Sequence, residues 1–166
     1  MVEYRDYNFA GKTMEFFVTH QTVEHYSGDC AVAFVFKDKT HQNKDLQQLL
    51  ELNRFDAIVG ATLMLSQVSG YKTKRLLIVG LGDSSLNEKN YMKVLNSLSS
   101  ALSDAKVKNV VIPDIQIDNR DESWIQLTTA RVLKNASYQV EKVDAKEENE
   151  KHTLEAVSIY SENNDA

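Results

Sequence analysis

The sequence has little of the residues that staple or interrupt a fold. Its one cysteine, Cys30, cannot form an intrachain disulfide, and its one proline, Pro113, lies late in the chain. Because Cys30 lies in the apolar run 30–36, we expect a buried, unreactive thiol and a reducing compartment. No apolar run approaches the ~20 residues that cross a bilayer, and residues 1–6 lack the apolar stretch of a signal peptide. We therefore expect a cytoplasmic protein without a membrane partner.

An excess of positive charge is also absent. The chain has 19 Lys and Arg against 24 Asp and Glu, a net charge of −5 and a pI near 5.4. This balance excludes a global positive field that would attract nucleic acid or anionic lipid. The length of 166 residues is that of one domain, and 42% hydrophobic residues can build a core without metal or disulfides.

Apolar runs and helical periodicity divide the chain into alternating strands and helices. Residues 1–13 show no period and are expected to form an N-terminal extension, 14–160 the domain, and 161–166 a polar C-terminal tail. The charged segment 141–151 is expected to be a solvated connection. The predicted strands are 14–20, 30–36, 61–68, 75–82, 109–115 and 153–160, and the predicted helices contain 46–50, begin near Ser85, and begin at Asp121 or Ser123.

The helix near Ser85 has the clearest signature. Ser85 and Glu88 have the spacing of a capping box, in which the side chain of each residue accepts a hydrogen bond from the backbone N–H of the other. Apolar residues then recur on one face from Tyr91 to Ala105. The alternation predicts an α/β domain whose mixed sheet of about six strands carries helices on both faces. The first two predicted strands have no helix between them, which favours an antiparallel pair.

The Gly80-Leu81-Gly82 turn is the strongest candidate for a phosphate site. Glycines between a strand and a helix can expose backbone N–H groups to a pyrophosphate. However, Ser85 stands where the fingerprint has a third glycine, and Asp83 places negative charge beside the site. A tight turn that lets the helix pack closely on the sheet is the favoured interpretation.

No catalytic, cofactor-binding or metal site emerges from the residues alone. His20, His25, His41 and His152 lack the spacing of metal ligands, and Cys30 lacks the setting of a nucleophile. Ser85 does not lie on a nucleophile elbow and serves better as a cap. Some aromatic residues could mark a contact surface, although packing in the core or a position in a loop is the simpler interpretation of each one. They are Tyr4, Tyr7, Tyr26, Tyr71 and Trp124.

The order of these segments resembles a known family. The strand opening at Met14, the strand 31–36, and the run 74–82 followed by a Leu- and Ala-rich helix are together similar to the N-terminal domain of the leucyl (cytosol) aminopeptidases. The likeness covers roughly residues 14–160, and residues 1–13 lie outside it. The resemblance implies a macro-domain-like fold that precedes a separate catalytic domain.

In that family two divalent ions, zinc or manganese, are held in the catalytic domain around an Asn-Thr-Asp-Ala-Glu-Gly-Arg-Leu motif. No such string occurs here, so the resemblance places no catalytic or metal-binding residue on this chain. It implies a catalytic aminopeptidase domain as partner, a homo-hexameric parent enzyme and a role in assembly or regulation. In some bacterial relatives this region takes part in DNA binding, which the pI near 5.4 does not support here.

Three functions remain open from the sequence. The first is a non-catalytic N-terminal domain of a leucyl aminopeptidase, inactive alone. The second is a macro-type module that binds ADP-ribose through Gly80 to Ser85. The third is a small α/β enzyme with a nucleotide cofactor, which only a copurifying cofactor would reveal.

Overall fold

The computed structural model describes residues 2–9, 12–83, 85–143 and 154–162, without the side chains of 2–13 and 137–143. The described residues form a seven-stranded mixed sheet in the order β1-β2-β7-β6-β3-β5-β4. The strands are β1 (Val2–Phe9), β2 (Lys12–Thr19), β3 (Cys30–Phe36), β4 (Thr62–Ser66), β5 (Arg75–Gly82), β6 (Asn109–Ile112) and β7 (Ala156–Tyr160), and the helices are α1 (Lys44–Leu52), α2 (Glu88–Asp104) and α3 (Glu122–Val143). The predicted α/β class with a mixed sheet is confirmed. None of the described helices combines the length and apolar character that a membrane crossing requires.

The five inner strands, β2, β7, β6, β3 and β5, run parallel, and each edge strand is antiparallel to its neighbour. The expected antiparallel pairing of the strands 14–20 and 30–36 is wrong. β2 and β3 run in the same direction and are separated by β7 and β6, which come much later in the sequence. The antiparallel pairs are instead β1 with β2 and β4 with β5.

The expectation of no regular element before residue 14 is also wrong. β1 pairs with β2 along its full length, from Val2 opposite Thr19 to Phe9 opposite Lys12. β1 forms an edge of the sheet, and its sequence shows no hydrophobic period from which it could be predicted. At the other end of the chain, α3 continues through Val143, and most of the predicted connection 141–151 lies outside the described residues.

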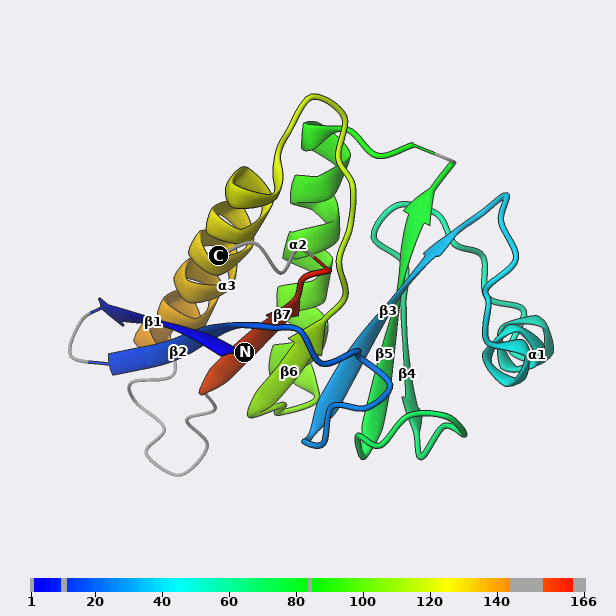
Figure 1. The fold of residues 1–166 in the computed structure, drawn as a ribbon, viewed down its shortest axis with the longest axis horizontal. Coiled ribbons are helices and arrows are strands. Elements are labelled where there is room, and N and C mark those ends of the chain that lie inside the picture. The colour runs from blue at the N-terminus through cyan, green and yellow to red at the C-terminus, as the bar shows by residue number, and fades with distance from the viewer. Residues whose placement is uncertain (1, 10–11, 84, 144–153, 163–166) are drawn as a thin grey trace.

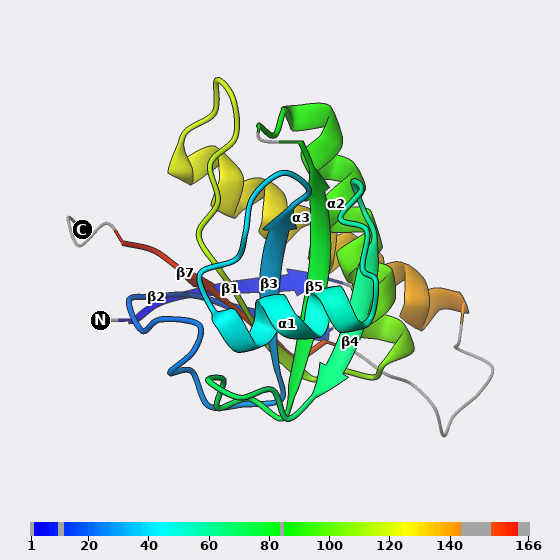
Figure 2. The same ribbon diagram turned by 90° about the vertical axis from the view of Figure 1, so that its right-hand side faces the viewer.

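Alternation along the inner strands creates two cores, one on each face of the sheet. Val32, Leu77 and Val79 pack with the buried face of α2 and α3, whereas Ala33 and Ile78 pack with Leu46 and Leu50 of α1 and its neighbours. Figure 2 shows α1 on one face and the two longer helices on the other. Strands buried on both faces require continuous apolar runs, which explains why these strands could be recognised from the sequence.

The helix caps differ in part from the prediction. α2 begins at Glu88, and its N-cap is Asn87, whose side chain accepts a hydrogen bond of 2.8 Å from the Asn90 N–H. The predicted capping box of Ser85 and Glu88 is therefore wrong. For α3, Asp121 rather than Ser123 is the cap, because its carboxylate accepts the Trp124 N–H at 2.9 Å.

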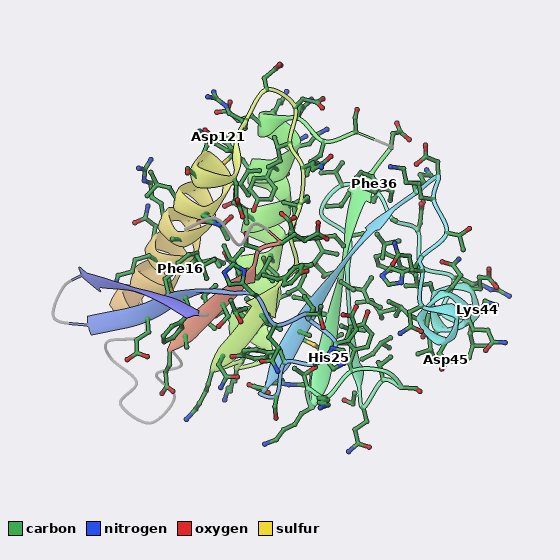
Figure 3. The ribbon with its side chains drawn as sticks, in the orientation of Figure 1. Phe16, His25, Phe36, Lys44, Asp45 and Asp121 are labelled. Atoms are coloured by element: carbon green, nitrogen blue, oxygen red, sulfur yellow. The ribbon has the colours of Figure 1, made fainter. Side chains whose placement is uncertain are left out.

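Parallel strands bring their carboxyl ends to one edge of the sheet. In Figure 1 the carboxyl ends of β3 and β5 point toward the top of the molecule, where α2 and α3 begin. Figure 3 places Phe36, the last residue of β3, and Asp121, the cap of α3, at this same end. β6 follows α2 in the chain but lies on the far side of β3 from β5, so the direction of winding reverses there. Crevices at such reversals are where open α/β sheets bind ligands.

Candidate functional site

A cavity of about 660 Å³ opens at the carboxyl edge of the sheet. It is lined by the ends of β3 and β5, by residues that follow β6 and β7, and by the loops around 22–24 and 39–42. Small-molecule sites in proteins occupy roughly 300–1,000 Å³, so the cavity has a suitable size. Because its walls come from strand ends, its shape is set by the sheet rather than by one loop.

Four carboxylates lie around the cavity, those of Glu24, Asp114, Asp118 and Glu162. No ion pair links them to a described Lys, Arg or His. Burial, and then the charges of Glu122 and Glu162, raise the pKa of Asp114 above its ordinary value. Burial, followed by the charges of Glu162, Asp114 and Glu24, likewise raises the pKa of Tyr160. Negative charge therefore dominates the cavity.

Positive charge at the cavity is sparse. The Nζ of Lys39 lies 4.5 Å from the centre of the Phe36 ring, a cation–π contact. Burial lowers the pKa of His41, although Glu24 opposes this effect. The Nδ1 of His41 accepts the Asn43 N–H at 3.0 Å, which defines it as an acceptor. A diphosphate would meet more carboxylates than cations in this cavity.

Gly80 and Gly82 do not form a phosphate cradle. The Gly80 N–H donates to the Ala61 carbonyl at 2.8 Å, and the Gly82 N–H donates to the Ala57 carbonyl at 2.8 Å. A Cβ on Gly80 would lie 2.3 Å from the Ile58 carbonyl oxygen, and Gly82 has φ +80°. These glycines therefore let the segment 57–61 approach β5, whereas we had expected them to let a helix pack on the sheet.

The four histidines do not converge. The Nδ1 of His20 hydrogen bonds the Ser161 carbonyl at 2.8 Å, and the Nδ1 of His25 contacts the Thr22 hydroxyl. His41 lies at the cavity, and His152 lies outside the described residues. The three described histidines therefore have separate surroundings.

Cys30 is buried, as predicted from its apolar run. Burial raises the pKa of its thiol to about 12, an effect that the nearby Arg75 only partly opposes. A thiol with this pKa is protonated at neutral pH and is a poor nucleophile.

The aromatic candidates are divided between packing and the cavity. Trp124 is half-buried, 6.5 Å from Tyr91 and 4.9 Å from the Arg120 guanidinium, as measured from its ring centre. Tyr26 and Tyr71 pack against the core on the α1 face, and Tyr71 also lines the cavity. The side chains of Tyr4 and Tyr7 lie outside the described part of the structure.

The carboxylates of the cavity are not among the residues that the sequence pattern singled out. Asp114 comes two residues after β6, and Glu162 comes two residues after β7. Polar residues directly after parallel strands were the signal that could have identified them, because these strand ends line the ligand crevice of α/β sheets.

The described residues do not fit the pair of divalent ions that the family resemblance implies for a catalytic domain. They contain no group of three or more His, Cys, Asp or Glu side chains placed to hold a metal ion. Two-metal catalysis needs a ligand set that holds both ions about 3.5–4 Å apart. We therefore derive no chemical step through a metal on this chain.

The chain matches the model of the cytosol aminopeptidase family, N-terminal domain, over residues 31–147. It is 37% identical over 130 residues to a protein of Vesicomyosocius okutanii named "Probable cytosol aminopeptidase", covering 78% of this chain and 27% of that protein. A protein of the same name from Nitrosomonas europaea is 26% identical over 159 residues, covering 88% of this chain and 32% of that protein. The chain therefore spans less than a third of the length of these two relatives.

Solved structures share the fold. A mutant of tomato leucine aminopeptidase matches with a TM-score of 0.65 and 20% identity, covering 96% of this chain and 35% of that one. The macrodomain of Thermus aquaticus DarG matches with a TM-score of 0.56 and 9% identity, covering 87% of this chain and 96% of that one. The Oceanobacillus iheyensis macrodomain with ADP matches with a TM-score of 0.57 and 12% identity, covering 98% of this chain and 90% of that one. The fold is macro-domain-like, and by sequence the chain belongs to the cytosol aminopeptidase family, as its N-terminal domain.

Proposed function

We propose that this chain is the non-catalytic part of a cytosolic leucyl aminopeptidase and supports the assembly of a catalytic aminopeptidase domain. The observation that carries the proposal is the match to the family's N-terminal domain over residues 31–147. In the proposed parent enzyme, two divalent metals in the catalytic domain would release N-terminal amino acids from peptides, and the particle would be a hexamer. The buried Cys30 suits a reducing cytoplasm.

The carboxyl-edge cavity supports a non-catalytic role. It brings carboxylates together with the hydroxyls of Tyr71 and Tyr160. Burial raises the pKa of Tyr71 to about 12, so its phenol is protonated at neutral pH and cannot serve as a base. His41 lies in the same cavity and interacts with Glu24, but the described residues contain no group of three or more His, Cys, Asp or Glu side chains placed to hold a metal ion.

Two experiments test the proposal. The purified chain, incubated with L-leucine amide and Mn²⁺ or Zn²⁺, is expected to give no turnover, with a full-length relative as positive control. Metal-dependent turnover by the chain itself would overturn the non-catalytic role.

The second experiment tests the assembly role with a chimaera, in which this chain replaces the corresponding region of the Vesicomyosocius relative. The chimaera is expected to keep that enzyme's particle size and activity, whereas deletion of the region should reduce both. A chimaera no better than the deletion would reject the assembly role.

ADP-ribose binding is a second candidate, favoured by the position and size of the cavity in a macro-domain-like fold. The carboxylates of Asp114, Glu162 and Glu24 oppose it, because they would repel a diphosphate. Calorimetry with ADP-ribose separates the two views. Micromolar binding would support the module, and no heat at millimolar ligand would reject it.

A further inference from the structure

β4 forms an edge of the sheet, and its outer side is not protected by charge. Its sequence, Thr-Leu-Met-Leu-Ser, contains no charged residue and no proline. Natural edge strands are usually blunted by lysine, proline or a bulge because their free N–H and C=O groups can pair with another strand. The opposite edge strand, β1, has Glu3, Arg5 and Asp6 in its sequence. β4 is thus the less protected edge.

The register with β5 identifies the free groups. In an antiparallel pair, alternate residues direct their N–H and C=O toward the partner strand. The Gly80 N–H donates to the Ala61 carbonyl, and the Gln67 N–H donates to the Lys74 carbonyl, at 2.8 and 2.9 Å. The alternation therefore directs the groups of Leu63 and Leu65 toward β5, and those of Thr62, Met64 and Ser66 away from it. Among the described residues, no turn or loop makes a backbone hydrogen bond to these outward groups.

Two large apolar side chains that come shortly before β4 in the sequence are exposed. Leu52, at the end of α1, is 79% exposed, and Ile58, in the segment leading to β4, is 52% exposed. Figure 2 shows the end of α1, this segment and β4 along one side of the molecule. The chain therefore exposes apolar side chains at the end of α1 and in the segment that leads to β4.

The free groups of β4 are self-complementary. A two-fold axis through Met64 pairs two copies of β4 antiparallel, with Thr62 opposite Ser66 of the other copy and Met64 opposite its own equivalent. Leu63 then lies opposite Leu65 of the other copy, and every outward N–H and C=O gains a partner. No like charges face each other in this register, because the strand has none. The symmetry favours a second copy over an unrelated strand.

We propose that β4 is a homodimer interface through which two copies of this chain join their sheets edge to edge. The inference does not depend on the proposed function, since it concerns self-association of the chain alone. The interface is small and the chain carries a net charge of −5, so the dimer is expected to be concentration-dependent and stronger at high salt.

Sedimentation velocity on the full chain, from micromolar to millimolar concentration, tests the interface through its register. Thr62→Lys with Ser66→Lys places like charges opposite each other at both ends, and self-association should weaken about tenfold. Thr62→Lys with Ser66→Glu places opposite charges in the same pairs and should restore it. The matched control is Asn96→Lys with Ser100→Lys, on the exposed side of α2, which should leave association unchanged.

Each outcome decides the proposal. A chain that is monomeric throughout, or a dimer that survives the paired lysines, would overturn it. Loss of the dimer in both β4 variants would reject the register, provided that circular dichroism shows both variants folded. Failure of the aminopeptidase chimaera would not affect this result, so the two proposals can fail separately.

Discussion

At the residue scale, the carboxylate of Asp29 connects two segments that are distant in the sequence. Its carboxylate accepts two hydrogen bonds of 2.9 Å from Arg75 and one of 3.0 Å from the Lys108 N–H. Arg75 also donates to the Ala105 carbonyl at 2.6 Å, at the end of α2. The Asp29 and Arg75 side chains are only 19% and 25% exposed. The pair therefore joins the starts of β3 and β5 to the segment before β6.

We expect Asp29→Ala to lower the free energy of unfolding by about 1.5–3 kcal/mol, because the half-buried guanidinium of Arg75 keeps only its hydrogen bond to the Ala105 carbonyl and the Lys108 N–H loses its acceptor. The matched control is Glu88→Ala, which removes the ion pair with Arg120, whose side chains are 49% and 41% exposed. Its cost should stay below about 1 kcal/mol, since solvent screens exposed pairs. Urea denaturation of both variants measures the difference, and equal costs would contradict this ranking.

Cys30 and the buried tyrosines give a second prediction at this scale. Burial raises the pKa of Cys30 from 9.0 to about 12, and that of Tyr91 from 10.0 to about 12. Between the unfolded and folded values, the unfolded chain releases protons that the folded chain retains. Stability should therefore be unaffected by these groups below pH 9 and fall as the pH rises above it.

Urea midpoints between pH 7 and 11 measure this fall. Cys30→Ala should flatten the curve between pH 9 and 10 and leave the decline above pH 10, which arises from the tyrosines. The comparison uses the slope of the curve, because lost packing lowers the midpoint of the variant at every pH. An unchanged slope between pH 9 and 10 would contradict the predicted role of Cys30.

At the scale of elements, the structure and the sequence pattern place the N-cap of α2 at different residues, Asn87 and Ser85. Asn87→Ala should cost about 1 kcal/mol of unfolding free energy, because it removes the acceptor for the Asn90 N–H. Ser85→Ala should change stability by less than about 0.5 kcal/mol, since Ser85 is exposed and lies before the cap. Thermal denaturation compares the stability of the two variants. A larger loss of stability for Ser85→Ala than for Asn87→Ala would support Ser85, and thus the capping box, as the cap of α2.

The elements that could be predicted are those whose pattern is local. The apolar stripe from Tyr91 to Ala105 identified α2, and the short apolar run that ends at Gly80 and Gly82 identified β5. β1 was not predicted, because its sequence shows no hydrophobic period, although its backbone pairs with β2 at the edge of the sheet. The role of Gly80 was also hidden, since the backbone that approaches it belongs to Ala57 and Ile58, more than twenty residues earlier.

At the scale of the whole molecule, the order of the strands in the sheet determines which residues line the cavity. β6 and β7 insert between β2 and β3, which brings the residues after four strands to one cavity. The sequence predicts each strand but not this order, because parallel pairing depends on contacts distant in the chain. Asp114 and Glu162 each follow a predicted strand, which could have marked them as residues of the crevice, but without the strand order neither could be placed beside Glu24, with which they act on Tyr160.

These gathered carboxylates make the carboxyl edge of the molecule sensitive to pH. Burial and then the charges of Glu122 and Glu162 raise the pKa of Asp114 above 3.8 in the folded chain. The folded state thus binds this proton more readily than the unfolded state. The favourable contribution of Asp114 is complete below its unfolded pKa and is lost as the pH rises through its folded pKa.

Asp114→Asn removes this charge, so we expect a higher urea midpoint than that of the parent chain at pH 7 and convergence of the two at pH 3, where the carboxyl is protonated. The matched control is Asp38→Asn, an exposed carboxylate outside the cavity lining, which should follow the parent chain at both pH values. Burial is the larger cause and salt does not screen it, but the repulsion by Glu122 and Glu162 is screened, so part of the gain from Asp114→Asn should be lost in high salt. A lower midpoint at pH 7 would mean that the Asp114 charge stabilises the fold, and would contradict the view of the cavity as a site of uncompensated negative charge.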